Sequence, residues 1–464
     1  MNNFMLSSAQ TSLAFFLHPK KFFLDFISFS GNFINKDNSY RNRMPSKGDI
    51  FFISRQRIIG RTNGSSAYLL DLADAAKGAG FTPHLLQPSP DLMGRWPVMR
   101  LRPEMSVFHS HEIRSVLKLG SWVISLDPGV FRDAILAIMI RWFRRAGLTA
   151  TWLKDRPRPY SIAAAWRNSD RSFVIRHARA RADLVIADYA FQAEALDLLP
   201  DLPGAIVMHD LFHRRKIASG GRDSVCHLDR DQEIALLRRA DAVLAIQADE
   251  AGFVSEHVPA ARSILAPMAV RPVEAAQPGA TGRLLFVGSN TAPNVVCLEW
   301  FFENVWPTVR SRSPETTLDV VGSVALAFPG RAPEGVRFHG IIDDLASIYA
   351  AAAVVISPLT FGSGLKIKLV EAMAQGKAVV ATSVTLQGVE HECRPVIRVA
   401  DEAQAFAEAV LSLEDEQHRL ALGTAALSAA RTHFSPQVCH AAFIAWLEDN
   451  RPDLDADPKV RNRS

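Results

Sequence analysis

Short apolar runs alternate with longer amphipathic stretches along most of this chain, and the alternation restricts the folds that it can adopt. Buried strands joined by helices are typical of parallel sheets with crossover connections. In the first half we expect strands at residues 50–54, 82–87, 184–187, 205–208 and 242–246. In the second half we expect strands at residues 283–287, 317–321, 336–339, 354–356 and 378–381. The sequence therefore predicts the α/β class, with two similar sheets.

The two predicted sheets are separated by a segment without apolar periodicity, which contains Pro272, Pro278, Gly279 and Gly282. Such a composition is typical of a linker, so we set a domain boundary near residue 278. The predicted parts are an N-terminal domain at 48–277, a C-terminal domain at 278–434, a terminal helix at 435–450 and a frayed tail at 451–464. We expect the terminal helix to pack back toward the N-terminal domain.

The first 47 residues are rich in Phe, Asn and Ser, whereas the later chain is rich in Ala, Arg and Leu. They also lack the basic-then-apolar order of a signal peptide. Met44 opens a run that leads directly into the first predicted strand. We therefore interpret residues 1–47 as a disordered extension or a mis-annotated start, in preference to a functional anchor.

Composition excludes several classes of protein. The 464 residues include 52 basic and 48 acidic side chains, and this near balance gives no reason to expect a nucleic-acid partner. The four cysteines lie far apart without CxxC spacing, which argues against a disulfide framework or a zinc site and favours a reducing compartment. No run of about 18 apolar residues predicts a transmembrane helix. We expect a cytoplasmic protein.

The second half of the chain carries the strongest local motif. A predicted buried strand at 354–356 leads into Gly362-Ser363-Gly364, and a helix then begins near Leu365. Backbone N–H groups are free at such a helix N-terminus, and the helix dipole directs its positive end toward a ligand. In doubly wound sheets this place lies beyond the carboxyl ends of the strands, where ligands bind. The motif therefore predicts an anion site that fits a phosphate.

Two charged residues follow on the same helix. Successive residues step by about 100°, so Gly364, Lys368 and Glu371 share one face. An ammonium group suits phosphate, and a carboxylate can accept two hydrogen bonds from ribose hydroxyls, so the pair suits a sugar nucleotide. The alternative is an exposed Lys/Glu pair that stabilises the helix by a few tenths of a kcal/mol. Taken alone, the pair fits this alternative better.

The surrounding sequence resembles a known motif. Residues 358–382 are similar to the donor-binding motif of the retaining GT-B glycosyltransferases of family four, glycosyl transferases group 1. The resemblance implies a GT-B fold, with two Rossmann-like doubly wound domains facing a cleft. In that family two glutamates eight positions apart contact the donor, the first at the hexose and the second at the ribose. Glu371 stands at the second position and Ser363 at the first, as in a family branch with the pattern Gly-x-Gly-x-Arg/Lys-x-Lys-x-x-Glu-Ala-Met.

The resemblance extends to residues 285–288, 320–322, 338–340 and 343–344. It implies that the donor binds beside the turn that contains Gly288, Ser289, Asn290 and Asn294. The residue types themselves fit either a diphosphate contact or the cap of the helix that begins near Pro293. The family's usual Arg and Lys are absent from this turn, so Lys368 is expected to supply the phosphate charge instead.

The N-terminal half carries a weaker signal. The loop at 60–66 resembles the family's glycine-rich loop, where the acceptor and the donor phosphate meet, and Gly64 and Ser65 are the expected contacts. Glycine permits a close approach of the backbone to a ligand. An ordinary helix N-cap formed by Ser65 and Ser66 is the alternative.

A second polar group in this half, His209 with Asp210, follows the predicted strand at 205–208, so we expect it to face the cleft. Together with the two arginines that follow, these side chains can orient a sugar hydroxyl and neutralise phosphate. We therefore name His209 and Asp210 as candidate catalytic residues, with a structural role for the histidine as the alternative.

Residues 131–182 are locally basic and aromatic, with eleven arginines and one lysine against three aspartates. A helix at 134–148 can lie on an anionic membrane surface at the inner membrane face, which would suit a lipid-linked acceptor. A helix with a solvated charged face is the alternative, and we favour it because such helices are common.

The resemblance implies transfer of a sugar from a nucleotide-diphosphate donor to an acceptor hydroxyl, with retention. The expected partners are a nucleotide sugar as donor substrate and a glycan or lipid-linked acceptor, with no cofactor and no metal ion. By analogy of fold the work would be in surface polysaccharide or glycolipid synthesis. The alternatives are a nucleotide-sugar epimerase on the same fold and a catalytically silent GT-B binding or scaffold protein, which the Ser363 replacement keeps open.

Overall fold

The computed structural model describes residues 46–94, 96–145, 161–214, 228–330, 332–342, 345–361 and 367–452. All of them belong to one unit, residues 46–464. The interpretation of residues 1–45, the roles of Gly362, Ser363, Gly364 and Leu365, the match at 343–344 and most of the predicted tail fall outside this described part.

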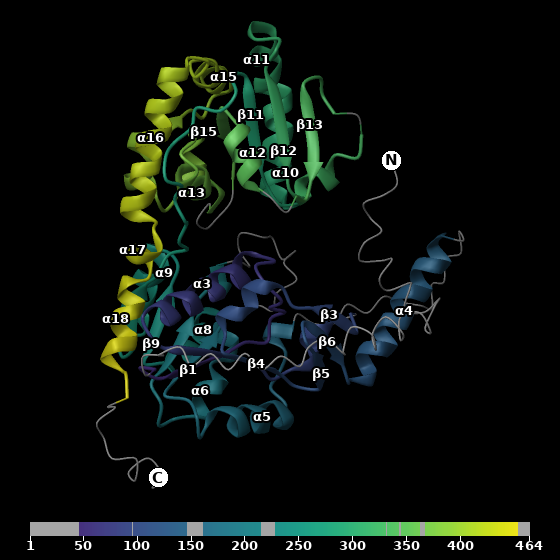
Figure 1. Cartoon of the computed structure of the whole chain (residues 1–464), viewed down its shortest axis with the longest axis vertical. Coiled ribbons are helices and arrows are strands. Elements are labelled where there is room, and N and C mark those ends of the chain that lie inside the picture. Colours follow the sequence, from purple (N-terminus) through teal and green to yellow (C-terminus); the bar gives the residue numbers. More distant parts are fainter. Residues whose placement is uncertain are drawn as a thin grey trace, which may run out of the picture. The chain divides into compact units, whose positions relative to one another are not determined.

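The first sheet has seven parallel strands in the order β10-β9-β8-β7-β1-β2-β4 (Figure 1). Their bounds are β1 (Asp49–Ile53), β2 (Thr82–Gln87), β4 (Ser110–Ile113), β7 (Leu184–Asp188), β8 (Gly204–Val207), β9 (Ala242–Ala245) and β10 (Arg262–Leu265). In sequence order, β1 is the first strand of this sheet; β2 and β4 follow on one side of it, and β7 to β10 follow on the other side. The order thus reverses between β1 and β7, and doubly wound sheets bind ligands at the carboxyl edge of such a point.

The second sheet has six parallel strands in the order β13-β12-β11-β14-β15-β16. Their bounds are β11 (Arg283–Val287), β12 (Thr317–Val321), β13 (Val336–Gly340), β14 (Val354–Ser357), β15 (Ala378–Ala381) and β16 (Arg398–Val399). Here the order reverses between β11 and β14. The two sheets therefore repeat one architecture, each with its own switch point.

These observations confirm the predicted α/β class with two parallel sheets. Each of the ten predicted strands is present, and its ends lie within one residue of the predicted bounds. Three further strands, β4, β10 and β16, were not predicted. The sequence of β4 is Ser-His-Glu-Ile and β16 has only two residues, so neither offers the apolar run that identifies a buried strand.

A small antiparallel sheet in the order β3-β6-β5 was also not predicted. It consists of β3 (Val98–Arg100), β5 (Val116–Leu119) and β6 (Trp122–Ser125), and α4 (Pro128–Arg145) follows it. Met93, Met99, Val123 and Val130 form its core, which α4 joins through Val130. The helix expected at 134–148 thus begins earlier, at Pro128, and residues 146–160 lie outside the described part.

Helices cover both faces of each sheet (Figure 1). On the first sheet, α3 (Gly64–Gly78) lies on one face, and α5 (Asn168–Ala178), α8 (Arg230–Leu237) and α9 (Ala248–His257) lie on the other. On the second, α10 (Ala292–Trp300), α11 (Trp306–Arg312) and α15 (Ala403–Leu411) cover one face, and α12 (Leu345–Ala351), α13 (Ile367–Ala374) and α16 (Glu416–His433) the other. Strand β1 shows why both faces need cover, because Ile50 and Phe52 enter one core and Phe51 and Ile53 the other.

The end of the described chain packs against the first sheet. Two helices, α17 (Pro436–Cys439) and α18 (Ala441–Asp449), occupy the span predicted as one terminal helix. Phe443, Trp446 and Leu447 of α18 are buried in the same core as α3 and β1. The C-terminal residues therefore complete the N-terminal domain.

The segment predicted as a linker is bonded to the second domain. Val273 N–H donates to the Ala374 carbonyl at 2.9 Å, and Ala280 N–H donates to the Ala351 carbonyl at 3.0 Å. The Lys377 side chain, which is buried, donates to the Gln277 carbonyl at 3.0 Å. These bonds fix the segment along its length, and the boundary near residue 278 stays a prediction.

Candidate functional site

The carboxyl edge of the second sheet is shaped by two turns that touch. Gly288 follows β11, and its N–H donates to the Val321 carbonyl at the end of β12 at 2.9 Å. Gly322 has a φ of 110°, and a Cβ there would lie 2.1 Å from the Gly288 carbonyl oxygen. A Cβ on Gly288 would lie 2.6 Å from the Phe286 ring. Both positions therefore require glycine, and the backbone itself forms this part of the edge.

The turn that follows Gly288 is held by Asn294. Its side-chain Nδ2 donates to the Ser289 carbonyl at 2.9 Å and lies 3.1 Å from the Thr291 hydroxyl. Asn290 N–H donates to the Ser323 hydroxyl at 2.9 Å. The N-cap of α10 is Thr291, so the expectation that Ser289 or Asn290 caps this helix is wrong. Ser289 and Asn290 are exposed at this edge, where a ligand can reach them.

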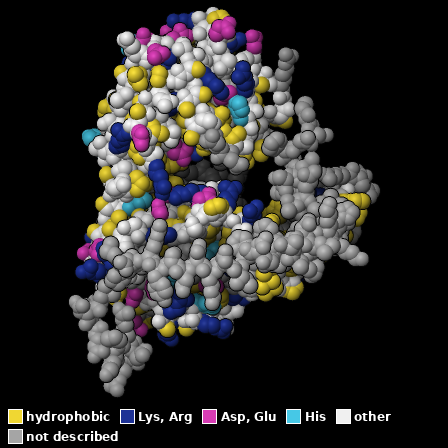
Figure 2. All heavy atoms as spheres, in the orientation of Figure 1, with side chains coloured by type: hydrophobic (Ala, Val, Ile, Leu, Met, Phe, Trp, Pro, Cys, Tyr) yellow, Lys and Arg dark blue, Asp and Glu magenta, His cyan; other side chains and the backbone are white. Residues whose placement is uncertain are grey.

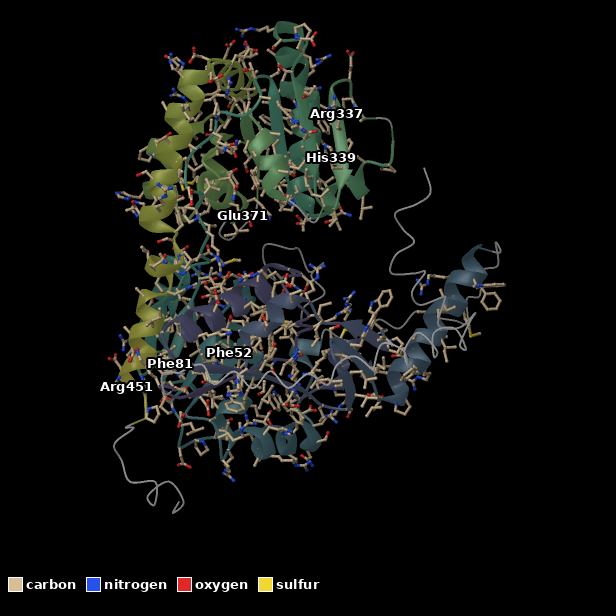
Figure 3. All side chains as sticks on the ribbon, viewed as in Figure 1. Phe52, Phe81, Arg337, His339, Glu371 and Arg451 are labelled. Carbon is tan, nitrogen blue, oxygen red and sulfur yellow. The ribbon has the colours of Figure 1, made fainter. Side chains whose placement is uncertain are left out.

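Helix α13 presents the predicted charged pair. Lys368 Nζ lies 2.7 Å from Glu371 Oε2, and the two side chains are 44% and 32% exposed. The other face of the helix is buried, with Leu369 and Met373 in the core of the second domain. Figure 3 shows Glu371 at the edge of this domain toward which β13 points. The pair thus shares the carboxyl edge with the turn after β11.

The end of α13 is fixed by a glycine, Gly376. Gly376 has a φ of 64°, and a Cβ there would lie 2.7 Å from the Ala276 Cα, so only glycine fits. The next residue, Lys377, was not recognised as important. Its ammonium group donates to three carbonyls, and burial lowers its pKa to about 8. Lys377 therefore anchors the helix end.

Below the charged pair lies a buried tyrosine, Tyr349 of α12. Its hydroxyl has no hydrogen-bond partner among the described residues. Burial raises the pKa of Tyr349 far above its ordinary value, and the Glu371 carboxylate adds to the effect. Tyr349 therefore stays neutral, near enough to Glu371 to be affected by the charge of that carboxylate.

In the first domain, His209 is held by a buried carboxylate. His209 follows β8, and its Nε2 lies 2.7 Å from Oδ1 of Asp188, the last residue of β7. The other oxygen of Asp188 accepts hydrogen bonds from the Ser54 hydroxyl at 2.5 Å and from Gln56 Nε2 at 2.7 Å. Asp188 is fully buried and the His209 side chain is 7% exposed. This network joins the ends of three neighbouring strands at the switch point of the sheet.

Aromatic rings fix the imidazole further. Tyr189 has a positive φ of 77°, which brings its ring to 4.0 Å from the His209 ring, and Tyr68 contacts the same ring edge-on at 5.8 Å. A non-glycine residue with positive φ is uncommon, and such strain is concentrated at functional sites. Sequence reasoning named His209 but missed Asp188, Ser54 and Gln56. The available signal was a polar residue at the carboxyl end of a predicted strand.

Asp210, the other candidate catalytic residue, lies in the same turn, and its Oδ1 accepts the Leu211 N–H at 2.9 Å. It also acts on Glu250, the third residue of α9, which accepts the N–H groups of Ile246 and Gln247. Burial raises the pKa of Glu250 to about 7, and the charge of Asp210 contributes to the rise. The first domain therefore holds a carboxyl group that titrates near neutral pH beside its candidate site.

The loop before α3 differs from its predicted capping. The N-cap is Asn63, whose side chain accepts the Ser66 N–H at 2.8 Å while the Ser66 hydroxyl accepts the Asn63 N–H at 3.1 Å. A cap formed by Ser65 and Ser66 is therefore wrong. Gly64 is the first residue of the helix, and a Cβ there would meet nothing within 4 Å. Space beside Gly64 and Ser65 is thus open, which fits the predicted ligand contact without requiring it.

The described part of the chain contains neither a membrane-spanning helix nor a cluster of metal ligands. No helix there combines the length and the apolar character needed to cross a bilayer. No three His, Cys, Asp or Glu side chains gather there in a way that would hold a metal ion.

Comparison with known proteins gives a family match for one part of the chain and a fold for most of it. Residues 281–416 match the profile of the family described as glycosyl transferases group 1. A stretch of 140 residues is 24% identical to an uncharacterised 44.6 kDa protein in the cps region of Klebsiella pneumoniae. That alignment covers 28% of this chain and 36% of the relative, so only about a third of the relative's length is spanned.

Solved structures match over most of the chain. Sucrose-phosphate synthase of Thermosynechococcus elongatus has a TM-score of 0.53 at 17% identity, covering 87% of this chain and 98% of that one. HepE of Anabaena, in complex with UDP, has a TM-score of 0.51 at 14% identity, covering 87% and 100%. A UDP-forming α,α-trehalose-phosphate synthase of Burkholderia xenovorans has a TM-score of 0.53 at 12% identity, covering 88% and 100%. The protein therefore has the GT-B fold, and its residues 281–416 are similar to the glycosyl transferases group 1 family.

Proposed function

We propose that the protein is a retaining glycosyltransferase that moves a sugar from a nucleotide-diphosphate donor to an acceptor hydroxyl. The position of Lys368 and Glu371 carries the proposal, because they lie at the carboxyl edge of a sheet within the segment that matches the family. Both side chains are partly exposed and can reach a ligand. The pair supplies the cation and the carboxylate that a nucleotide diphosphate needs.

In this proposal Glu371 accepts hydrogen bonds from the ribose hydroxyls, and Lys368 faces the diphosphate. The turn formed by Gly288, Ser289 and Asn290, with the free N–H groups at the start of α10, adds donors for phosphate oxygens. The ion pair would have to open or share its charges with the ligand. An exposed helical pair contributes only about 0.3 to 0.5 kcal/mol, so opening it costs little compared with a charge-assisted bond to phosphate.

The loop that precedes α13 in the sequence would complete the donor site. We propose that Gly362, Ser363, Gly364 and Leu365 contact the donor from the N-terminal side of α13, as the family resemblance implies. Ser363, in place of a glutamate, would offer the hexose a hydroxyl instead of a carboxylate.

In the first domain we assign the candidate catalytic role to His209, with Asp188 as its positioning residue and Asp210 beside it. The Asp188 carboxylate accepts a hydrogen bond from His209 Nε2–H and so fixes the tautomer, which leaves Nδ1 to act on a sugar hydroxyl or a phosphate oxygen. Gly64 and Ser65 would contact the acceptor or the donor phosphate at the start of α3.

For the donor we propose uridine diphosphate as the nucleotide, because HepE was solved with UDP and the Burkholderia synthase is UDP-forming. For the acceptor we propose a glycan or a lipid-linked glycan in surface polysaccharide synthesis. The support for this is the relative from the cps region of Klebsiella pneumoniae.

We further propose that transfer needs no bound metal ion, with Lys368 and the N-termini of α10 and α13 stabilising the leaving diphosphate. A cytoplasmic location, at the inner membrane face where the acceptor is lipid-linked, would suit the buried free thiols of Cys297, Cys393 and Cys439.

The test is a calorimetric titration of the protein with UDP, GDP and their common sugar conjugates, repeated on Glu371→Ala. Glu315→Ala is the matched control, because Glu315 is exposed in the turn before β12, at the opposite edge of the same sheet. We expect saturable binding of one nucleotide, weakened at least tenfold in Glu371→Ala and unchanged in Glu315→Ala. Equal binding by both variants would refute the assigned donor site.

Release of free nucleotide then separates the three functions. A glycosyltransferase releases nucleotide faster when an acceptor is present, and an epimerase converts the donor without releasing it. A scaffold binds nucleotide but converts nothing, and that result would reject the enzymatic proposal.

A further inference from the structure

Helix α4 carries an exposed apolar stripe. Phe131, Ile135, Ile138, Met139 and Trp142 are all exposed, with Trp142 at 75%. At about 100° per residue these five positions fall within one arc of roughly 100° on the helix surface. Figure 2 shows hydrophobic side chains at the surface in the region of α4 and the small sheet. A soluble helix normally turns such a stripe toward a core, and here the stripe faces away from it.

The helix is anchored by other residues. Val130 is fully buried in the core of the small sheet, and Ile140 is also buried. On the same helical projection both lie outside the stripe, Ile140 nearly opposite its centre. The packing that holds α4 therefore leaves the stripe without a partner among the described residues.

Positive charge borders the stripe. In the projection Arg132 lies about 20° beyond one edge of the stripe and Arg141 about 60° beyond the other edge. The Arg132 side chain is 79% exposed. The helix contains four arginines and a single acidic residue, Asp133, which pairs with Arg132 at 3.2 Å. An apolar stripe with arginines on both sides is the pattern of a helix that lies in the plane of a bilayer surface.

We propose that α4 docks the protein on an anionic membrane surface, with the stripe inserted at the boundary between headgroups and acyl chains. Arg132 and Arg141 would then lie at the depth of the lipid phosphates, and Trp142 would sit where tryptophan is enriched at membrane interfaces. The neighbouring strand β5 exposes Leu117 and Leu119, one on each side of Lys118, which adds apolar surface to the same region. The charge pattern favours a lipid surface over a protein groove. Anionic headgroups can pair with these arginines anywhere on the surface, whereas a protein groove would need acidic side chains at matching positions.

This inference goes beyond the proposed sugar transfer, and its test involves no sugar substrate. The full chain is floated with vesicles of phosphatidylcholine containing 30% phosphatidylglycerol and with vesicles of phosphatidylcholine alone. The test variant is Ile135→Ser/Trp142→Ser. The matched control is Leu420→Ser/Val438→Ser, which alters two exposed apolar side chains of α16 and α17.

We expect the unaltered chain and the control to bind the anionic vesicles, and the α4 variant to bind at least tenfold more weakly with an unchanged melting temperature. A second variant, Arg132→Gln/Arg141→Gln, should reduce the preference for anionic over neutral vesicles, as should 1 M salt. These substitutions lie at exposed positions, so misfolding does not account for a loss.

Three outcomes would overturn the proposal. The unaltered chain could fail to bind either vesicle, or the α4 variant could bind as well as the control. Sedimentation velocity gives the third outcome, in which the unaltered chain is a dimer and Ile135→Ser/Trp142→Ser is a monomer without any vesicle binding. The stripe would then be an interface between two copies of this chain.

Discussion

The carboxyl edges of the two sheets hold their polar side chains in different ways. In the first domain, buried side chains fix one another, with Asp188 bonded to Ser54, Gln56 and His209. In the second domain the backbone forms the edge, and the charged pair on α13 lies partly exposed above it. A buried network sets its geometry before any ligand arrives, whereas an exposed pair takes its final arrangement from the ligand. Four sets of substitutions test this difference.

Replacing Asp188 with alanine should destabilise the protein by about 3 to 4 kcal/mol, because three buried donors lose their acceptor. Urea unfolding measures the loss, and Asp201→Ala, in an exposed turn, is the control. A loss no larger than that of the control would show that the network is not structural, and the contrast between the edges would fail.

The stability of the first domain should depend on Glu250. Its pKa rises to about 7 in the folded protein from 4.5, so the folded state holds this proton more tightly than the unfolded state. Stability is then highest below pH 4.5 for this group and falls as pH rises toward 7, by on the order of 3 kcal/mol. Glu250→Gln cannot ionise and should flatten this part of the unfolding profile. Parallel profiles for both proteins would contradict the assignment.

The turn after β11 should tolerate change better. Asn294→Ala removes the amide that bonds to Ser289 and Thr291, but these groups are exposed and water can replace it. We expect a loss of about 1 kcal/mol or less in thermal unfolding. A loss as large as that of Asp188→Ala would show that this edge is also held by side chains.

The smallest effect on stability is expected at Lys368. Lys368→Ala breaks the ion pair with Glu371, which should cost no more than about 0.5 kcal/mol because both groups are partly exposed. Nucleotide affinity, by contrast, should fall about tenfold, since the ligand loses a charged partner. Lys77→Ala is the comparison for affinity, because Lys77 is exposed in the last turn of α3 in the first domain. Equal losses in both variants would point to a general effect of charge.

The same contrast explains what could be predicted from the sequence. The edge of the second domain is built from short local motifs, so its glycines, its charged pair and its family resemblance were all readable from the sequence. The network of the first domain joins Ser54 to Asp188, 134 residues apart, and depends on β7 pairing with β1. No local pattern encodes that pairing. The strands β1 and β7 were both predicted, but nothing in the sequence indicated that they lie side by side.

Local rules also failed where several neighbouring residues can form the same cap. Asn63, Ser65 and Ser66 can each cap α3, and the backbone selects Asn63 with Ser66 in the reciprocal position. The polar strand β4 was missed because it pairs with only one neighbour, β2, and its residues lack an apolar run. Local backbone geometry decided the first case, and tertiary pairing decided the second.

The return of α18 to the first sheet has a consequence for synthesis. Phe443, Trp446 and Leu447 complete a core whose first residue in the sequence is Ile50. The N-terminal domain is therefore translated first but receives its last core residues at the end of translation. While the ribosome translates the second domain, the first must wait with part of an apolar face uncovered. A chain that stops short of residue 441 would therefore lose stability at its N-terminal half, far along the sequence from the missing residues.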